Sequence, residues 1–490
     1  MPAIIGDWNS RPAPSPCISG RGLPSELVAS APDRYHWRMR FDYSDRNIEL
    51  GLLYPAHLET VCARHDEALD KAGAAHAVIF SGAPHPVFLD DTHYPFRCNA
   101  HFLAWVPLTR LPLSFVVYTP GEKPRLIYYQ PRDYWHVVPD DPDGYWTAYF
   151  EIRIVHTFEA VAAELPEARD KCVLIGEIGD PAQAFGIERI NPITAVNSLH
   201  YARGVKTDYE LACMRLASRR AVSGHLAAAA AFRDGAAEFE IHRAYCGAAS
   251  HTDNELPYEN IVALNEHAAV LHYTNLDRDP PALPRSFLID AGAQVHGYAS
   301  DVTRTHSNGD AAFGTLLRGI ETLQQTIVGR VAAGVDFRKL HLDTHRLLAE
   351  LLIDAELATG SADSLLESGI TSVFLPHGLG HLLGIQVHDV GGHMADDNGT
   401  TIEPPPGHPY LRLTRVLVED MVLTIEPGIY FIDMLLASLR GTPAEKQVNW
   451  SAIDSLRPFG GIRIEDNVRV LADGAENLTR DAFADLAARR

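Results

Sequence analysis

Cysteine is scarce in this sequence. Six cysteines are scattered over 490 residues, without a C-x-x-C pair and without a dense framework. Small secreted domains are the proteins that depend on disulfide frameworks, so this pattern argues against that class. We therefore expect reduced thiols in a cytoplasmic protein.

Long apolar runs are missing as well. The sequence has no stretch of about 18 apolar residues, the length needed for a membrane span. Its start, MPAIIGDWNSRPAPSPCISG, lacks the basic residues and the continuous apolar stretch of a secretory signal. We expect no membrane association.

Positive charge is the third deficit. Lys and Arg together number 42 against 63 Asp and Glu, which gives a formal net charge of -21 at pH 7. Nucleic acids and anionic lipids are bound mainly through clustered Lys and Arg, so we expect no nucleic-acid partner. Bound cations would neutralise part of this negative charge.

The length predicts two domains, because single hydrophobic cores stop growing near about 250 to 300 residues. Residues 1–46 are rich in Pro, Ser, Gly and Arg without periodicity, which is typical of a flexible extension. Residues 47–200 combine helical spacing with short apolar strands and predict an N-terminal α/β domain. Residues 201–490 form the second predicted domain, which opens with a capping-box signal, Thr207 followed by Glu210.

The segment SFLIDAGAQVHGYASDVTRTHS predicts a β-hairpin with a turn at Val295 to Tyr298. A pairing centred between Val295 and His296 places Asp290 directly opposite Asp301, where like charges are destabilising unless compensated. A bound cation would compensate them. The alternative is a solvated hairpin with two incidental aspartates.

Two glutamates end or interrupt other apolar strands. Glu426 closes the β-branched run in MVLTIEPGIYF, and Glu465 lies within the alternating pattern of GGIRIEDNVRV. Buried carboxylates need partners or metal because desolvating an isolated charge is costly. Two divalent ions carry a charge that balances four carboxylates, which favours a two-metal site. Taken singly, each glutamate is equally well an ordinary strand-end residue.

A histidine cluster follows in FLPHGLGHLLGIQVHDVGGH, with His377, His381, His388 and His393. Its glycines allow close backbone approach, and neutral imidazole is a common metal ligand. One imidazole among four carboxylates suits Mn²⁺ better than the Cys and His sets of structural zinc. Any one of these histidines, His393 above all, is also compatible with a hydrogen-bonded core position. Beyond them, residues 391–408 are too irregular for helix or strand, and such loops are often functional.

Arg463 lies two residues before Glu465 in GIRIED, so both side chains share one strand face, opposite Ile462 and Ile464. A guanidinium beside the carboxylates is able to hold a substrate carboxylate through two hydrogen bonds. A structural salt bridge is the alternative role.

Together these motifs resemble the pita-bread metallopeptidases, which include methionine aminopeptidase, aminopeptidase P, creatinase and prolidase. The runs LIDAGAQVHGYASDVTRTHS, PHGLGHLLGIQVHDVGG, VLTIEPGIYF and GGIRIEDN carry the resemblance. From about Leu52 onward, VFLDDTHYPFRCNAHFLAWVP, YYQPRDYWH and PYENIVALNEHAAVLHYTNLD are similar to the bacterial prolidase branch, which includes organophosphorus acid anhydrolase. The resemblance implies an N-terminal α/β domain followed by a pita-bread, creatinase/aminopeptidase-like catalytic domain.

The resemblance also implies the metal ligands. Asp290 would chelate one ion and Asp301 would bridge both. His381 and Glu426 would bind the second ion, and Glu465 would bridge. The cofactors would be two divalent ions, Mn²⁺ in particular, with a hydroxide between them as the nucleophile and Glu426 as the proton shuttle.

Further residues match family positions around the substrate. His377 and His388 are the candidate catalytic histidines near the reacting carbonyl. The candidate substrate-binding residues are Tyr258, His272 and Arg463.

The implied activity is hydrolysis of Xaa-Pro dipeptides with release of proline, with a side activity on organophosphorus P–F and P–O bonds. The implied assembly is a homodimer in which the N-terminal domain of one chain closes the partner site, and Trp135 is the candidate crossing residue. Two alternatives remain open: an aminopeptidase P that acts on longer peptides, and a peptide-binding module without catalysis. The metal bound in the cell, the preferred first residue of the dipeptide and the role of residues 1–46 are not defined by these patterns.

Overall fold

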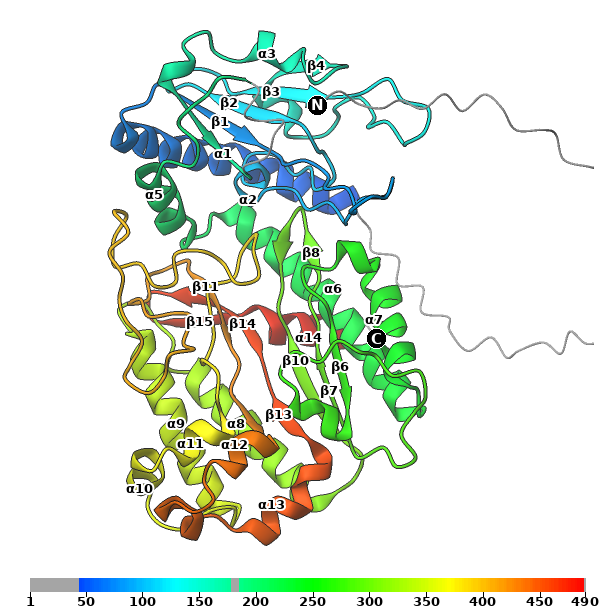
Figure 1. Cartoon of the computed structure of the whole chain (residues 1–490), viewed down its shortest axis with the longest axis vertical. Coiled ribbons are helices and arrows are strands. Elements are labelled where there is room, and N and C mark those ends of the chain that lie inside the picture. The colour runs from blue at the N-terminus through cyan, green and yellow to red at the C-terminus, as the bar shows by residue number, and fades with distance from the viewer. Residues whose placement is uncertain (1–43, 178–184, 489–490) are drawn as a thin grey trace, which may run out of the picture. The chain divides into compact units, whose positions relative to one another are not determined.

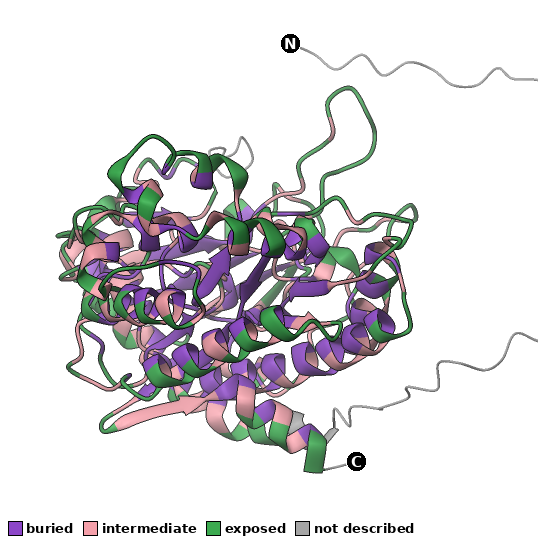
Figure 2. Cartoon of the chain, turned by 90° about the horizontal axis from the view of Figure 1, so that it is seen from below, coloured by how far each residue is buried: buried purple, intermediate pink, exposed green. Residues whose placement is uncertain are grey.

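The computed structural model describes residues 44–177 and 185–488 (Figure 1). The predicted flexible extension lies outside these residues, apart from residues 44–46, which begin the first helix. In Figure 2 most of the strands and the inner faces of the helices are buried. This mixture of helices and strands confirms the predicted α/β class. No helix in the described ranges has both the length and the apolar composition needed to cross a membrane.

A five-stranded mixed sheet forms the first part of the fold. Its strand order is β4-β3-β2-β1-β5, with β1 parallel to β5, β3 parallel to β4, and antiparallel pairing elsewhere. Four of the five strands are formed by short apolar runs of the kind that predicted an α/β domain over residues 47–200: HAVIF, SFVVYT, RLIYY and KCVLIG. The strands are β1 (His76–Phe80), β2 (Phe115–Tyr118), β3 (Arg125–Tyr129), β4 (Glu151–Val155) and β5 (Cys172–Ile175).

Helix α1 (Ser44–Ala72) packs its apolar stripe against α5 (Ile193–Arg203). The stripe repeats at helical spacing, with Leu50, Tyr54 and Leu58 among its buried members. The same hydrophobic cluster continues into the next helix, α6 (Asp208–Arg233). The core is therefore continuous across the predicted domain boundary near residue 200, and that boundary stays a prediction.

Helix α6 (Asp208–Arg233) begins where the sequence predicted. The Thr207 hydroxyl accepts from the backbone of Glu210 at 3.3 Å, and the Glu210 carboxylate accepts from the Thr207 amide at 2.8 Å, which closes the capping box. Helices α7 (Glu238–Ala249) and α14 (Leu478–Ala488) pack against α6 (Figure 1). The other helices of this part are α8 (Ala311–Val328), α9 (Phe337–Asp354), α10 (Ala362–Glu367), α11 (Ile370–Phe374), α12 (Asp433–Ala437) and α13 (Trp450–Leu456).

Several small antiparallel sheets carry the site. Their orders are β10-β7-β6, β11-β14-β15, β12-β13 and β8-β9. The strands are β6 (Ile261–Leu264), β7 (Ser286–Asp290), β8 (Gln294–Val295), β9 (Tyr298–Ala299), β10 (Thr303–Ser307), β11 (Val422–Ile425), β12 (Gly428–Tyr430), β13 (Gly461–Arg463), β14 (Asp466–Leu471) and β15 (Gly474–Asn477). Short helices α2 (Ala100–Leu103) and α3 (Val161–Glu164) belong to the first part.

Glu465 lies at the junction between two of these sheets. Strand β13 ends at Arg463 and β14 begins at Asp466, while a bridge pairs Glu465 with Thr303. The prediction that Glu465 lies inside one alternating strand is therefore wrong. The chain crosses here from one sheet to the next, which brings β10 and β14 together at the carboxylate.

Candidate functional site

The hairpin that carries Asp290 and Asp301 turns where predicted but pairs in another register. Its two loop residues, His296 and Gly297, have φ of 54° and 90°, as a tight hairpin turn requires. Asp290 pairs with Thr303, so the prediction that it directly faces Asp301 is wrong. The turn is centred between His296 and Gly297, which shifts the pairing by two residues. A shift of two preserves the strand face, so both carboxylates still point into the same site.

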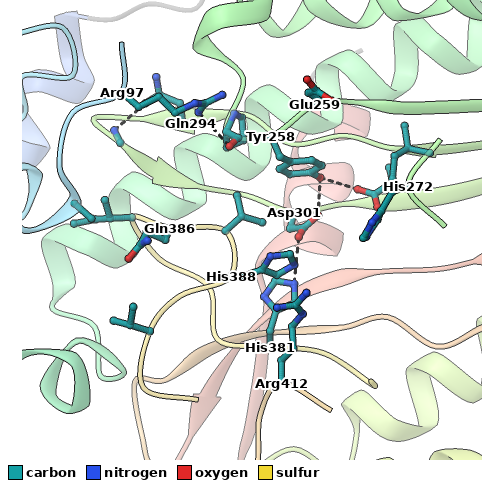
Figure 3. A pocket seen from close by; sticks show the side chains of 18 of the residues that line it. Arg97, Tyr258, Glu259, His272, Gln294, Asp301, His381, Gln386, His388 and Arg412 are labelled. Atoms are coloured by element: carbon teal, nitrogen blue, oxygen red, sulfur yellow. Dashed lines mark hydrogen bonds and ion pairs between the residues drawn. The ribbon is translucent and has the colours of Figure 1, made fainter. Parts of the chain in front are cut away.

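Tyr258 joins the two aspartates. Its hydroxyl oxygen lies 2.8 Å from Oδ1 of Asp290 and 2.5 Å from Oδ1 of Asp301 (Figure 3). The ring fits because Gly292 has no side chain: a Cβ there would lie 2.7 Å from the Tyr258 ring and 2.1 Å from the Ser300 carbonyl oxygen. A phenol has one proton, so it donates to one carboxylate at a time. The second close oxygen pair requires another proton or a cation.

His381 and Glu426 are brought together by backbone pairing. The His381 amide donates to the Thr424 hydroxyl at 3.1 Å, and the Thr424 amide donates to the His381 carbonyl at 2.9 Å. Gly380 permits this approach, because a Cβ there would lie 1.9 Å from the Thr424 carbonyl oxygen. The pairing leaves His381 Nε2 3.4 Å from Asp301 Oδ2 and 3.7 Å from Glu426 Oε1.

Glu465 completes the group of ligand-type atoms. Each of Asp301, His381 and Glu465 offers one such atom, and these atoms lie within 4.8 Å of one another. Glu465 is 2% exposed and accepts from the Thr303 hydroxyl at 2.6 Å. His381 Nδ1 donates to the Leu382 carbonyl at 3.0 Å, and this hydrogen bond directs Nε2 at the carboxylates.

We call Asp290, Asp301, Glu426 and Glu465 the carboxylate cluster. Burial raises the pKa of Asp290, raises that of Glu426 to about 7, and raises that of Glu465 well above its usual value. Burial also acts on Asp301, but His381 and Tyr258 outweigh it and lower its pKa. The neighbouring carboxylates add repulsion. Cations would relieve this repulsion, and the oxygen-rich donor set fits hard divalent ions.

Arg463 is an arginine that contacts the carboxylate cluster directly, and its guanidinium is already engaged. Nη2 lies 2.7 Å from Asp290 Oδ2, Nη1 donates to the Tyr430 hydroxyl at 2.9 Å, and Nε donates to the Thr303 hydroxyl at 3.3 Å. The Tyr430 hydroxyl in turn lies 2.8 Å from His377 Nε2. Burial and the Arg463 charge lower the pKa of His377 to about 4, so this histidine is neutral near pH 7.

Asp466 and Asn467, which directly follow Glu465, hold the strands that carry the site, and the sequence did not predict them. The Asn467 side chain accepts from the Asp301 amide at 3.0 Å and donates to the Asp301 carbonyl. Asp466 is fully buried and accepts from Arg304 at 2.7 Å. The signal was available as the polar run EDN inside an apolar segment.

All the predicted site residues line one pocket of about 2450 Å³. Figure 3 labels Tyr258, His272, Asp301, His381 and His388 among the residues that line it. They come from strands, junctions and loops far apart in sequence. His272 and His388 are exposed in the pocket, and the His388 ring centroid lies 4.5 Å from that of His381. The set is Tyr258, His272, Asp290, Asp301, His377, His381, His388, Glu426, Arg463 and Glu465.

Arg412 lines the same pocket and was not predicted. It is exposed, and within the described ranges its guanidinium has no hydrogen bond or ion pair. Loss of hydration, the His381 charge and then the Arg412 charge lower the pKa of His388 to about 4. An uncommitted cation therefore lies near His388, where it is available to an anionic group.

A buried ion cluster anchors the segment that carries His388. Asp389 accepts from Arg203 Nη2 at 2.6 Å and from Lys206 Nζ at 3.1 Å. All three side chains are buried. The cluster ties the His388 segment to the link between α5 and α6.

The family models match both parts of the chain. The model described as the N-terminal domain of Xaa-Pro dipeptidase matches residues 52–201, and that of metallopeptidase family M24 matches residues 212–472. A protein named Xaa-Pro dipeptidase from Xanthomonas campestris pv. campestris (strain B100) is 52% identical over 438 residues, which are 89% of this chain and 98% of that protein. One from Stenotrophomonas maltophilia (strain K279a) is 50% identical over 436 residues, with the same shares covered.

Solved structures show the same fold. The Pseudomonas aeruginosa aminopeptidase PepP superposes with a TM-score of 0.67 at 22% identity, over 87% of this chain and 97% of that one. The zinc-substituted E. coli aminopeptidase P in complex with product gives 0.65 at 22% identity, over 88% and 98%. At this identity the likeness concerns the fold, and it confirms the predicted N-terminal domain followed by a pita-bread catalytic domain.

Proposed function

The chain belongs to metallopeptidase family M24, in its Xaa-Pro dipeptidase branch, and we propose that it hydrolyses Xaa-Pro dipeptides with release of proline. The observation that carries the proposal is the convergence of the carboxylate cluster and His381 in one pocket. Relatives of 50 to 52% identity, matched over 98% of their length, carry the name Xaa-Pro dipeptidase. Proline release from a series of Xaa-Pro dipeptides, measured beside Xaa-Pro-Xaa tripeptides, tests it. Cleavage of the tripeptides alone would contradict it.

We propose that two divalent ions, Mn²⁺ in particular, are the cofactors. Asp290, Asp301, His381, Glu426 and Glu465 would hold them, with Asp301 and Glu465 shared between the ions. Four carboxylates against the single charge of Arg463 leave a deficit that one divalent ion does not cover. When bound, the ions lower the pKa of water and polarise a carbonyl group.

The chain's own residues supply proton transfer and orientation. Glu426 is our candidate for the proton shuttle toward the prolyl nitrogen, because its carboxylate lines the pocket beside His377 and His381, 3.8 and 3.7 Å away. His388 and His272 are exposed in the pocket and available to the substrate. His377 is fixed by Tyr430, so we assign it to holding the Glu426 side of the pocket, where its Nδ1 lies 3.8 Å from Glu426 Oε2.

The substrate carboxylate has two candidate anchors. Arg463 is the predicted one, but its guanidinium already contacts Asp290, Tyr430 and Thr303. Arg412 is exposed in the pocket and uncommitted within the described ranges. We propose that Arg412 holds the carboxylate and that Arg463 orients Asp290. Substrates with a free and an amidated terminus separate these roles.

We also propose that a homodimer limits substrate length. A pocket of about 2450 Å³ exceeds the roughly 300 to 1,000 Å³ of a typical small-ligand pocket, so this chain alone does not restrict the substrate to a dipeptide. Tyr134, Trp135 and Val137 are 85%, 77% and 98% exposed, which suits a loop covered by a partner. Light scattering gives the oligomeric state, and Trp135→Ala should extend cleavage to tripeptides. A fully active monomer would contradict the arrangement.

The organophosphorus side activity remains a prediction from the resemblance, since P–F and P–O cleavage also needs a polarising metal pair. A fluorophosphonate assay on the metal-loaded protein measures it. A non-catalytic peptide-binding role would require binding of Xaa-Pro peptides without proline release from the same preparation.

A further inference from the structure

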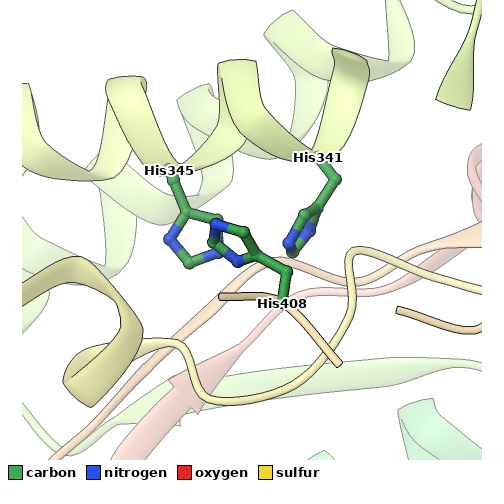
Figure 4. A group of neighbouring side chains, drawn as sticks. All are labelled: His341, His345 and His408. Carbon is green, nitrogen blue, oxygen red and sulfur yellow. The ribbon is translucent and has the colours of Figure 1, made fainter. Parts of the chain in front are cut away.

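Three histidines gather outside the pocket. His341 and His345 project from one side of α9 toward His408 (Figure 4). His408 lies at the end of the irregular segment 391–408, which forms neither helix nor strand. The ring centroids are 4.7 Å apart for His341 and His345, 4.6 Å for His341 and His408, and 4.5 Å for His345 and His408. We call this group the three-histidine cluster.

The ring nitrogens of the two helix histidines lack partners. His341 is 1% exposed and His345 is 0% exposed, yet neither ring nitrogen of either one has a hydrogen bond within the described ranges. Buried polar atoms are almost always satisfied, because an unsatisfied one carries its full desolvation cost. Four unsatisfied nitrogens side by side therefore indicate a missing partner common to the group.

From this arrangement we infer that His341, His345 and His408 form a transition-metal site, separate from the carboxylate cluster, that takes Zn²⁺. Each residue offers one nitrogen, and these nitrogens lie within 4.8 Å of one another. Ligand nitrogens on a tetrahedral zinc ion lie about 3.3 Å apart, so the rings need to close by no more than about 1.5 Å. The separation of four residues along α9 places two imidazoles on one helix face, as in helical zinc motifs.

The chemistry of the group selects the metal. Burial lowers the pKa of His341 to about 2 and that of His345 to about 3, so both rings are neutral, which is the form that binds metal. Neutral imidazole suits Zn²⁺ and other late first-row ions, whereas Mn²⁺ and Mg²⁺ prefer oxygen. Three protein nitrogens leave a fourth position for water.

The consequence is a clamp on the pocket wall. The His408 amide donates to the Pro405 carbonyl at 3.0 Å, so His408 is held in a turn. The residues that follow it, Pro409 to Arg412, line the pocket. An ion that joins His408 to α9 fixes the start of this wall, and with it the position of Arg412.

Anomalous scattering locates the ion in the intact protein. Crystals grown with Mn²⁺ and then equilibrated with Zn²⁺ are measured on both sides of the zinc absorption edge. We expect a zinc peak among the three histidines of the wild type. The matched variants are His408→Gln, which removes the loop ligand, and His306→Gln, a partly buried histidine stacked on Phe287 away from the cluster. The peak should vanish in His408→Gln and persist in His306→Gln.

Solution measurements follow the same variants. After dialysis the wild type and His306→Gln should retain one zinc ion per chain more than His408→Gln. In protein already saturated with Mn²⁺, zinc should raise their unfolding temperatures and slow proteolysis within residues 404–412, and should do neither in His408→Gln. A cluster without a peak at saturating zinc overturns the site. A peak that persists in His408→Gln overturns the clamp. Neither result depends on the hydrolytic activity.

Discussion

The carboxylate cluster and the three-histidine cluster are both buried groups of metal-ligand side chains, but burial acts on them in opposite ways. In the carboxylate cluster every carboxylate contacts a protein donor, yet burial, together with repulsion from the neighbouring carboxylates, still raises the pKa of Glu465. In the three-histidine cluster, burial lowers the pKa of His341 so that the ring is neutral, and the ring nitrogens of His341 and His345 have no hydrogen-bond partner within the described ranges. The first group demands cations in order to function, whereas the second persists without one.

The largest difference between the two clusters is expected in how the activity responds to the removal of divalent ions. Chelation should abolish proline release and Mn²⁺ should restore it, with about two ions per chain in the carboxylate cluster. Asp301→Asn should lower kcat/KM by more than about 100-fold, since outer partners of a ligand alone contribute 10- to 100-fold. In Mn²⁺ alone, His408→Gln should stay within about twofold of wild type.

Metal titration refines this test. Asp301→Asn should lower the affinity for both ions, because a shared carboxylate binds two of them. His381→Ala should lower the affinity for mainly one ion. A fully active chelated protein, or unchanged affinities in both variants, would remove these residues from the site.

A buried carboxylate neutralised by protein cations provides a contrast to the metal-dependent group. Lys206→Met removes one of the two cations that contact Asp389 and leaves Arg203, and it should lower the free energy of unfolding by about 3 to 5 kcal/mol. The loss should be the same with and without Mn²⁺. The control is Arg330→Met, which breaks an exposed ion pair with Asp343 and should change stability by less than about 1 kcal/mol. Denaturant titration measures both, and a metal-dependent loss in Lys206→Met would contradict the contrast.

Variants of Arg412 and Arg463 test which of the two arginines binds the substrate carboxylate. Arg412→Ala should lower kcat/KM for Xaa-Pro by roughly 10- to 150-fold, because a hydrogen bond to a charged group contributes about 1.5 to 3 kcal/mol. It should have little effect on a neutral Xaa-Pro amide. Arg463→Ala should affect both substrates equally, through Asp290, and Arg463→Lys should rescue only partly because an ammonium cannot replace the guanidinium fork. A loss confined to the free acid in Arg463→Ala, at full metal content, would restore Arg463 as the anchor.

The smallest effect is expected in the three-histidine cluster without metal. His345→Leu should change the free energy of unfolding by less than about 1.5 kcal/mol, or stabilise the protein, because it removes polar atoms that have no partners. The control is His65→Leu, which is similarly buried but whose ring contacts the Val61 carbonyl at 2.8 Å and the Trp105 indole nitrogen at 3.2 Å. The control should lose more, by about 1 to 3 kcal/mol for the unpaired Trp105. Thermal and denaturant unfolding of chelated protein compare them, and equal losses would mean that His345 has a partner.

Local patterns were sufficient for much of the fold. The capping box at Thr207, the four apolar strands of the first sheet and the turn at His296 and Gly297 each depend on residues adjacent in sequence. The candidate ligands were found for a similar reason, because a carboxylate inside an apolar run is conspicuous. The register of the hairpin was missed because a displacement of two residues leaves the pattern of faces unchanged.

The sequence by itself determined the mixed α/β class, the candidate ligands and, through its motifs, the metallopeptidase family. The tertiary structure alone decided which distant residues share a contact: Tyr258 between two aspartates, Arg463 on Asp290, Asn467 behind Asp301, and Arg412 in the pocket wall. It also brought His408 to α9, more than 60 positions away from His345 in sequence. These contacts follow from packing between segments, and packing depends on the shapes of both partners, which no local period of the sequence records.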